Sequence, residues 1–113
     1  MTVFVYDKTF EGLLTAVFDA YSRRSFPDLL LAEGEPFPLF YDEAVTICTD
    51  DAKVDRVWKG LQKRLSATAL SVITVAWLSE LPGADMLLFR YIRKAIDAPR
   101  SIETNFADPD VLR

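Results

Sequence analysis

The chain begins with a short apolar run and continues into a stretch with helical spacing. Residues 2–6 are β-branched and aromatic without a break, which predicts a strand. Residues 44–49 predict a second strand. Strands joined by such a crossover are normally parallel, but the sequence leaves the pairing direction open. Apolar residues at spacings of three and four predict a helix between them, on Phe10, Leu13, Leu14, Val17, Phe18 and Tyr21.

The second half of the chain is predicted to be helical. Asp50 or Asp51 is placed to cap an amphipathic helix that runs as far as Leu65. Residues 66–79 contain no charged side chain, which predicts a central helix buried on most sides. A last amphipathic helix is expected over residues 85–98 and is stopped by a proline.

The predicted order is β-α-β-α-α-α, which is typical of an α+β or small α/β fold with two short strands and about four helices, one of them central and buried. Proline and glycine break up residues 25–43, which we expect to be irregular and to pack across the domain surface. The length of 113 residues suits one domain, predicted over residues 1–98. Residues 99–113 are polar and aperiodic, so they are expected to be a tail or a connection to a missing C-terminal half.

The composition limits the chemistry that this chain can perform. Half of the residues are hydrophobic and 27% are charged, which is the balance of a folded protein. With no histidine and one cysteine, the chain cannot build a serine triad, a Cys–His dyad, a His/Cys zinc site or an internal disulfide. Its four glycines are never clustered, so no phosphate loop is present. We therefore expect no catalytic set, no metal and no cofactor.

The sequence favours a cytoplasmic protein without a membrane segment. The most apolar stretch, residues 67–78, is well below the ~20 residues that a membrane-spanning helix needs. The first residues lack the basic region and the apolar length of a signal peptide. Cys48 lies in the second predicted strand with no base to activate it, so it is predicted to be a small buried hydrophobe.

The charge is distributed unevenly along the chain. The net charge is −4, but residues 1–50 carry nine acidic and three basic side chains, whereas residues 51–100 carry five acidic and nine basic ones. Two basic helix faces are candidates for contacting a nucleic-acid backbone or an acidic partner; they contain Arg56, Lys59, Lys63, Arg64, Arg90, Arg93 and Lys94. The alternative is that these are ordinary solvated faces of amphipathic helices.

Three segments carry a resemblance to a known family. They are residues 3–14 (VFVYDKTFEGLL), 55–61 (DRVWKGL) and 89–92 (FRYI). They resemble a bacterial family of unknown function labelled "probable DNA metabolism protein", and the resemblance covers nearly the whole chain. It implies a role beside a radical S-adenosylmethionine (radical SAM) protein that acts on DNA, and some members are fused to a uracil-DNA glycosylase-like domain. Members are longer, so this chain resembles their N-terminal half, as a truncated domain would.

The resemblance and the basic faces together favour a function without catalysis by this chain alone. We expect an accessory or scaffold protein of a bacterial DNA modification or repair system, which binds a radical SAM protein, another partner or DNA. One alternative is a fragment of a DNA base-processing enzyme whose active site needs the missing half. That alternative predicts an exposed apolar surface where the other half packs. Another is an interaction module that dimerises through a sheet edge.

Overall fold

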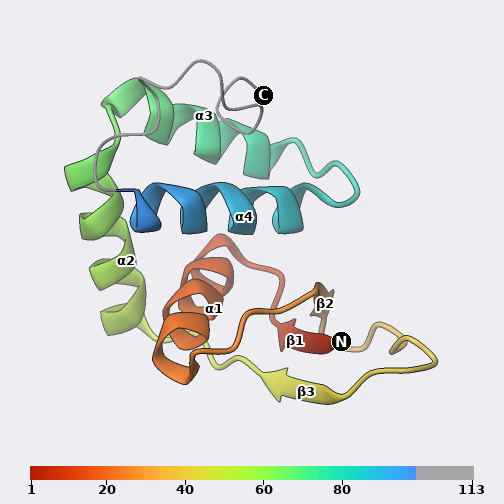
Figure 1. Ribbon diagram of the computed structural model, residues 1–113. Coiled ribbons are helices and arrows are strands. Elements are labelled where there is room, and N and C mark those ends of the chain that lie inside the picture. Colours follow the sequence, from red (N-terminus) through yellow and green to blue (C-terminus); the bar gives the residue numbers. More distant parts are fainter. Residues whose placement is uncertain (99–113) are drawn as a thin grey trace. The chain divides into compact units, whose positions relative to one another are not determined.

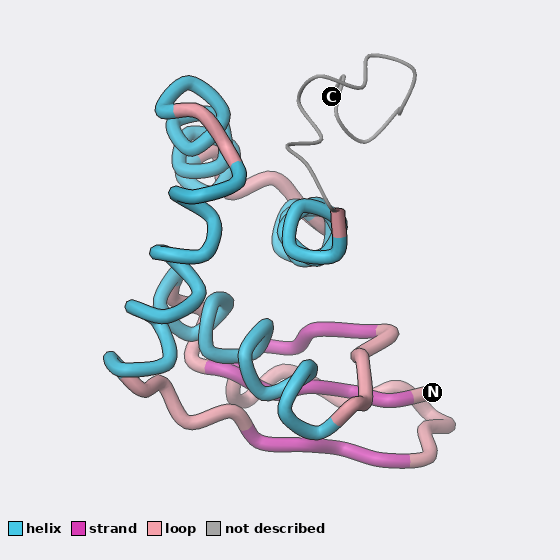
Figure 2. The backbone as a smooth tube through the Cα atoms, turned by 60° about the vertical axis from the view of Figure 1, so that its left-hand side comes forward, coloured by secondary structure: helices cyan, strands magenta, loops and turns pink. Residues whose placement is uncertain are grey.

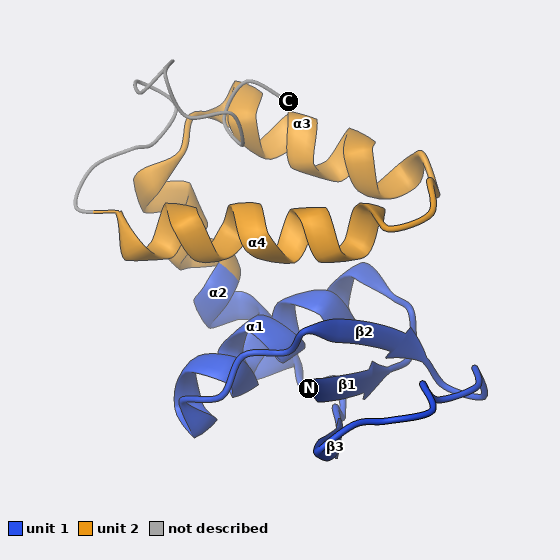
Figure 3. Ribbon diagram, turned by 45° about the vertical axis from the view of Figure 1, so that its right-hand side comes forward, with its two compact units in different colours: residues 1–57 blue, residues 58–113 orange. Residues whose placement is uncertain are grey.

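Residues 1–98 of the computed structural model are described here, and they form an α+β fold of four helices and a three-stranded parallel sheet (Figure 1). The chain divides into two compact units, residues 1–57 and 58–113 (Figure 3), and the boundary falls within helix α2. The single domain expected over residues 1–98 stays a prediction. The tail or connection expected over residues 99–113 lies outside the described residues.

The sheet of the first unit is built around the N-terminal strand. β1 (Thr2–Tyr6) is central, with β2 (Leu29–Ala32) on one side and β3 (Glu43–Thr46) on the other. Both neighbours run parallel to β1, and Phe4 lies opposite Leu30 in one and Val45 in the other. The parallel pairing of β1 and β3 is the one that such a crossover normally gives, and it decides the direction that the sequence leaves open.

The third strand, β2, corrects the prediction that residues 25–43 are irregular and that the sheet has two strands. Its four residues show no polar–apolar alternation and stand between Pro27 and Gly34, so local sequence gives little strand signal. The strand exists because its backbone pairs with β1, more than twenty residues away in sequence. Leu30 and Leu31 are buried, which explains the apolar content of this stretch.

Helix α1 (Phe10–Arg23) packs on β1 and covers one face of the sheet (Figure 2). Its start is fixed by Thr9, whose hydroxyl accepts a hydrogen bond from the Gly12 amide at 2.9 Å. The helix ends at Arg24, which adopts a left-handed conformation. The core of the first unit is formed mainly by buried residues of β1 and α1, which are Val3, Phe4, Tyr6, Leu13, Leu14, Ala16, Val17 and Ala20.

The remaining helices follow the predicted boundaries closely. They are α2 (Asp51–Arg64), α3 (Ala67–Leu78) and α4 (Ala84–Asp97). The Asp50 carboxylate accepts from two amides in the first turn of α2, and the hydroxyl of Ser66 caps α3 in the same way. In the second unit α3 packs against α4, and its buried apolar residues are Leu61, Leu65, Ile73, Leu88, Phe89, Ile92 and Ala95.

Helix α3 forms where it was predicted, but the prediction that it is central and buried is wrong. Ile73 is the one residue of α3 that the described structure places in the buried class, at 1% exposure. Most of the helix is exposed or half-buried, although it contains no charged side chain. A lack of charge shows that a helix can be buried at low cost. Burial itself requires neighbours on several sides, and the neighbouring helix that packs closely on α3 here is α4.

Candidate functional site

The carboxyl ends of β1 and β3 meet at the position where open parallel sheets commonly bind ligands, because the chain moves from one side of β1 to the other. Asp7 occupies this position. Its carboxylate accepts hydrogen bonds from the hydroxyl of Thr9 at 2.6 Å, from the Thr9 amide at 3.1 Å and from the hydroxyl of Thr49 at 2.7 Å. The side chain therefore connects the start of α1 to the segment after β3.

This carboxylate is engaged in holding the fold together. The hydrogen bonds from the hydroxyls of Thr9 and Thr49 hold the pKa of Asp7 below its ordinary value. Gly12 lies directly against it, because a Cβ at that position would stand 2.3 Å from the Asp7 Oδ1. At the carboxyl ends of β1 and β3 these contacts form a structural cluster, here called the latch, made of Asp7, Thr9, Gly12 and Thr49.

Substituting Asp7 by asparagine is expected to remove a contribution to stability that depends on pH. Because the folded-state pKa is lowered, the stabilisation by the carboxylate is present above pH ~4 and is lost as the pH falls through the folded-state pKa. At neutral pH the Asp7→Asn variant should lose stability on the order of 1 kcal/mol, and this difference from the native chain should shrink towards acid pH. Urea unfolding at several pH values measures it.

The matched control for this experiment is Glu33→Gln, which removes another exposed carboxylate just beyond β2. It should leave the free energy of unfolding close to that of the native chain at neutral pH. A constant difference between Asp7→Asn and the native chain from neutral to acid pH would show that the Asp7 charge contributes nothing to the latch.

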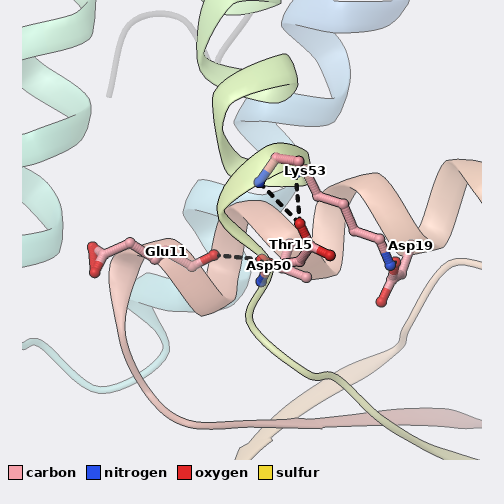
Figure 4. A network of polar contacts seen from close by, with 6 residues as sticks. Glu11, Thr15, Asp19, Asp50 and Lys53 are labelled. Carbon is pink, nitrogen blue, oxygen red and sulfur yellow. Dashed lines mark hydrogen bonds and ion pairs between the residues drawn. The ribbon is translucent and has the colours of Figure 1, made fainter.

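A second polar network joins α1 to the start of α2 (Figure 4). The buried hydroxyl of Thr15 donates to the Glu11 carbonyl at 2.9 Å and accepts from the Asp50 amide at 3.2 Å. Lys53 reaches back to Asp19, with 2.8 Å between Nζ and Oδ1, and this hydrogen bond raises the pKa of Lys53. The network fixes the first turn of α2 against α1 within residues 1–57.

Two cations of α2 lie over one aromatic ring of α1. Lys53 Nζ is 5.5 Å and the Arg56 guanidinium carbon 5.9 Å from the centroid of the Phe18 ring. Arg56 is a candidate binding residue from the sequence. The structure exposes it and places it beside the ring of Phe18. Phe18 and Asp19 were assigned no such role from the sequence, because only the folded chain brings them beside α2.

The other six predicted binding residues belong to the second unit. Lys59 and Lys63 are exposed on α2, and Arg90 is exposed on α4. Arg64 donates a hydrogen bond to the Ala98 carbonyl, and Arg93 forms an ion pair with Asp97 at 3.8 Å. Lys94 is exposed in the last turn of α4. The structure thus brings Arg64 to the C-terminal end of α4, while Arg56 lies in the first unit.

An exposed apolar surface, which the sequence reasoning missed, lies along α3 and the turn that follows it. Four large aliphatic side chains form what is here called the α3 surface; their exposed fractions are 54% for Val72, 65% for Val75, 70% for Leu78 and 66% for Leu81. The signal was present in the sequence as the uncharged stretch 66–79, which was interpreted as burial. Contiguous exposed apolar surface is characteristic of interaction sites, so the α3 surface is a candidate for one.

The prediction that Cys48 is buried is wrong, because its side chain is exposed. Ile47 still extends the pairing of β3, since its amide donates to the Val5 carbonyl at 2.7 Å. Val45 and Ile47 are buried while Thr46 and Cys48 are exposed, which is the alternation of a strand with one covered face. Counting that alternation from Val45 would have placed the thiol on the open face.

Within residues 1–98 no group of three or more potential ligand side chains is arranged to hold a metal ion. Over the same residues, none of the helices combines the length and the apolar character needed to cross a membrane.

Comparison with known proteins found no matching family model, no matching curated protein and no matching solved structure. The resemblance carried by residues 3–14, 55–61 and 89–92 therefore stays a prediction. The candidate surfaces are defined by this chain's own residues: the α3 surface, and the exposed cations of α2 and α4.

Proposed function

We propose that this chain is a non-catalytic accessory protein of a bacterial DNA modification or repair system, located in the cytoplasm, which docks a partner protein on its α3 surface. The observation that carries the proposal is the row of exposed aliphatic side chains on α3 and the turn after it. The resemblance described above supplies the partner, a radical SAM protein. An exposed thiol at Cys48 is compatible with the reducing interior of a cell.

A protein partner suits this surface because of its chemistry. Val72, Val75 and Leu78 follow one another at intervals of three residues, so they lie along one side of the helix. Burying aliphatic side chains against an apolar partner is favoured by the hydrophobic effect. The same side chains provide no hydrogen bonds for a polar small molecule. The cations of α4, the helix packed on α3, add favourable charge for an acidic rim on the partner.

The test is binding of the purified radical SAM protein to the native chain and to a Val75→Asp, Leu78→Asp double variant. Burying these side chains at the centre of an interface predicts a loss of affinity of about thirtyfold or more. The matched control is a Thr68→Asp, Ser71→Asp double variant, which adds the same two charges at exposed positions of α3. Titration calorimetry gives the affinities. Equal affinity for all three proteins would overturn the docking proposal.

Contact with a nucleic-acid backbone is the second part of the proposal and rests on the exposed cations of α2. DNA affinity measured against salt should fall as salt rises, and reversing the charges of Arg56, Lys59 and Lys63 to glutamate should reduce both the affinity and the salt slope. Identical binding by the native and reversed chains, with no salt slope, would remove DNA contact from the proposal while leaving the protein partner untouched.

The enzyme-fragment alternative draws support from the same observation. It predicts an exposed apolar surface where a further half of the protein packs, and the α3 surface has that character. Adding the second half in trans should then protect the α3 surface and produce lesion-dependent activity on damaged DNA. Sheet-edge dimerisation remains a third proposal, since β2 and β3 are the two edges of the described sheet. A chain that stays monomeric in sedimentation would exclude it.

A further inference from the structure

A second exposed apolar surface lies in the first unit, in the connection between β2 and β3. Leu39 is 88% exposed and Phe40 is 82% exposed, and the half-exposed rings of Phe37 and Tyr41 contact each other with 5.2 Å between their centroids. These four residues are here called the aromatic loop. A hollow of about 330 Å³ opens between the loop and Met1.

The aromatic loop is held in place at its end. The Asp42 amide donates to the Met1 carbonyl at 2.8 Å, and the Asp42 carboxylate pairs with the Met1 amino group. This pairing lowers the pKa of Asp42 and raises that of the Met1 amino group. A loop fixed in this way presents its apolar side chains at a lower entropic cost than a free segment would.

The surroundings of the aromatic loop are acidic. Residues 28–43 contain five carboxylates and no lysine or arginine. Two of the carboxylates pair with cations from elsewhere in the chain, Asp42 with the Met1 amino group and Glu43 with Arg23. The net negative charge of the segment therefore comes from Asp28, Glu33 and Glu35. The loop thus combines exposed aromatic and aliphatic side chains with negative charge. Its complement is an apolar surface accompanied by positive charge.

The second unit of the same chain carries that complement. Residues 58–98 contain six basic and three acidic side chains, a net charge of +3, and they include the α3 surface. On α4, which packs against α3, the exposed residues Leu87, Arg90 and Lys94 follow at spacings of three and four, so an aliphatic side chain and two cations share one side of that helix.

We propose that two copies of this chain associate head to tail, with the aromatic loop of one copy docked on the α3 surface of the next. The proposal rests on the proposed use of the α3 surface as a docking site, and it names a second copy as one occupant. The two contacting surfaces differ, so the contact is heterologous and leaves a free loop at one end of a dimer and a free α3 surface at the other. Further copies add until a ring closes.

The test uses two variants that each destroy one surface. Phe40→Asp places a charge in the aromatic loop, and Leu78→Asp places one in the α3 surface. In sedimentation velocity the native chain should form dimers and larger species as its concentration rises, and each variant alone should stay monomeric. An equimolar mixture should form a dimer and nothing larger, because one intact loop meets one intact α3 surface. Thr68→Asp should associate like the native chain.

Salt gives an independent readout of the charge complementarity. The dissociation constant of the native chain should rise by about threefold or more between low and high salt, because screening weakens the attraction between the acidic loop and the cationic unit. Circular dichroism of each variant confirms that it is folded before its sedimentation is interpreted.

Three outcomes would overturn the head-to-tail contact. The native chain could be monomeric at every concentration, the Phe40→Asp variant could still dimerise alone, or the equimolar mixture could stay monomeric. The proposed function is judged separately, since Phe40→Asp leaves the α3 surface intact and removes the competing loop, so this variant should bind the radical SAM protein at least as tightly as the native chain does. The experiments can therefore show partner docking without self-association. They can equally show self-association without partner docking.

Discussion

Replacing Gly12 by alanine is expected to destabilise the chain by about 2–3 kcal/mol, although alanine is the better helix former. A Cβ at this position would stand 2.3 Å from the Asp7 Oδ1, 3.1 Å from the Thr9 Oγ1 and 3.1 Å from Tyr6 Cδ2. Tyr6 is fully buried, and Asp7 and Thr9 are hydrogen-bonded to each other. Relieving the clash therefore disrupts the latch and the cap of α1 together.

The chain offers a matched control at Gly60, in the interior of α2. A Cβ there meets no other atom within 4 Å, so Gly60→Ala should stabilise the chain by about 0.5–1 kcal/mol through helix propensity alone. Chemical denaturation followed by circular dichroism gives both free energies of unfolding. If Gly12→Ala were as stable as Gly60→Ala, the close approach of α1 to Asp7 would be refuted.

The second large effect is a loss of stability within α3, which should differ sharply between alanine variants of two residues that lie two positions apart. Ile73 is 1% exposed and Val75 is 65% exposed. Ile73→Ala should cost about 2–4 kcal/mol of unfolding free energy, because it removes buried methyl groups and leaves a cavity between α3 and its neighbours. Val75→Ala should change stability by about 0.5 kcal/mol or less, since its side chain is in solvent and alanine favours the helix.

The comparison of these two variants tests the correction that the structure makes to the sequence prediction. Both substitutions replace a β-branched residue by alanine in the same helix, so differences in helix propensity nearly cancel. Equal large losses at both positions would show that α3 is buried all round, as the uncharged sequence predicted. A loss at Ile73 alone would establish the exposed face that the docking proposals require.

The candidate site could be predicted only in part. The cations of α2 and α4 were found from their spacing, and Lys59, Lys63 and Arg90 are exposed as a binding role requires. Their surroundings could not be derived, because the ring of Phe18 reaches Arg56 only through the packing of α1 on α2. The stretch that forms the α3 surface is expected from the sequence to be buried, and the segment with the aromatic loop is expected to pack across the domain surface. Both instead expose large apolar side chains. Apolar composition alone does not say which side chains find a neighbour.

The sequence by itself determined where most elements begin and end. Residues 2–6 became β1, and the helical spacing from Phe10 onwards became α1, because strand and helix periods are local properties of the chain. The caps at Thr9, Asp50 and Ser66 are local too, since each bonds to amides two or three residues ahead.

Tertiary structure decided the features that depend on distant partners. β2 is a strand because β1 pairs with it, and the latch exists because Thr49 reaches Asp7 across 42 residues of sequence. The exposure of α3 and the burial of Ile73 within it were also settled by the neighbours that the fold supplies. Local spacing fixes which side chains share a face of an element, whereas packing alone decides which of those faces meets solvent.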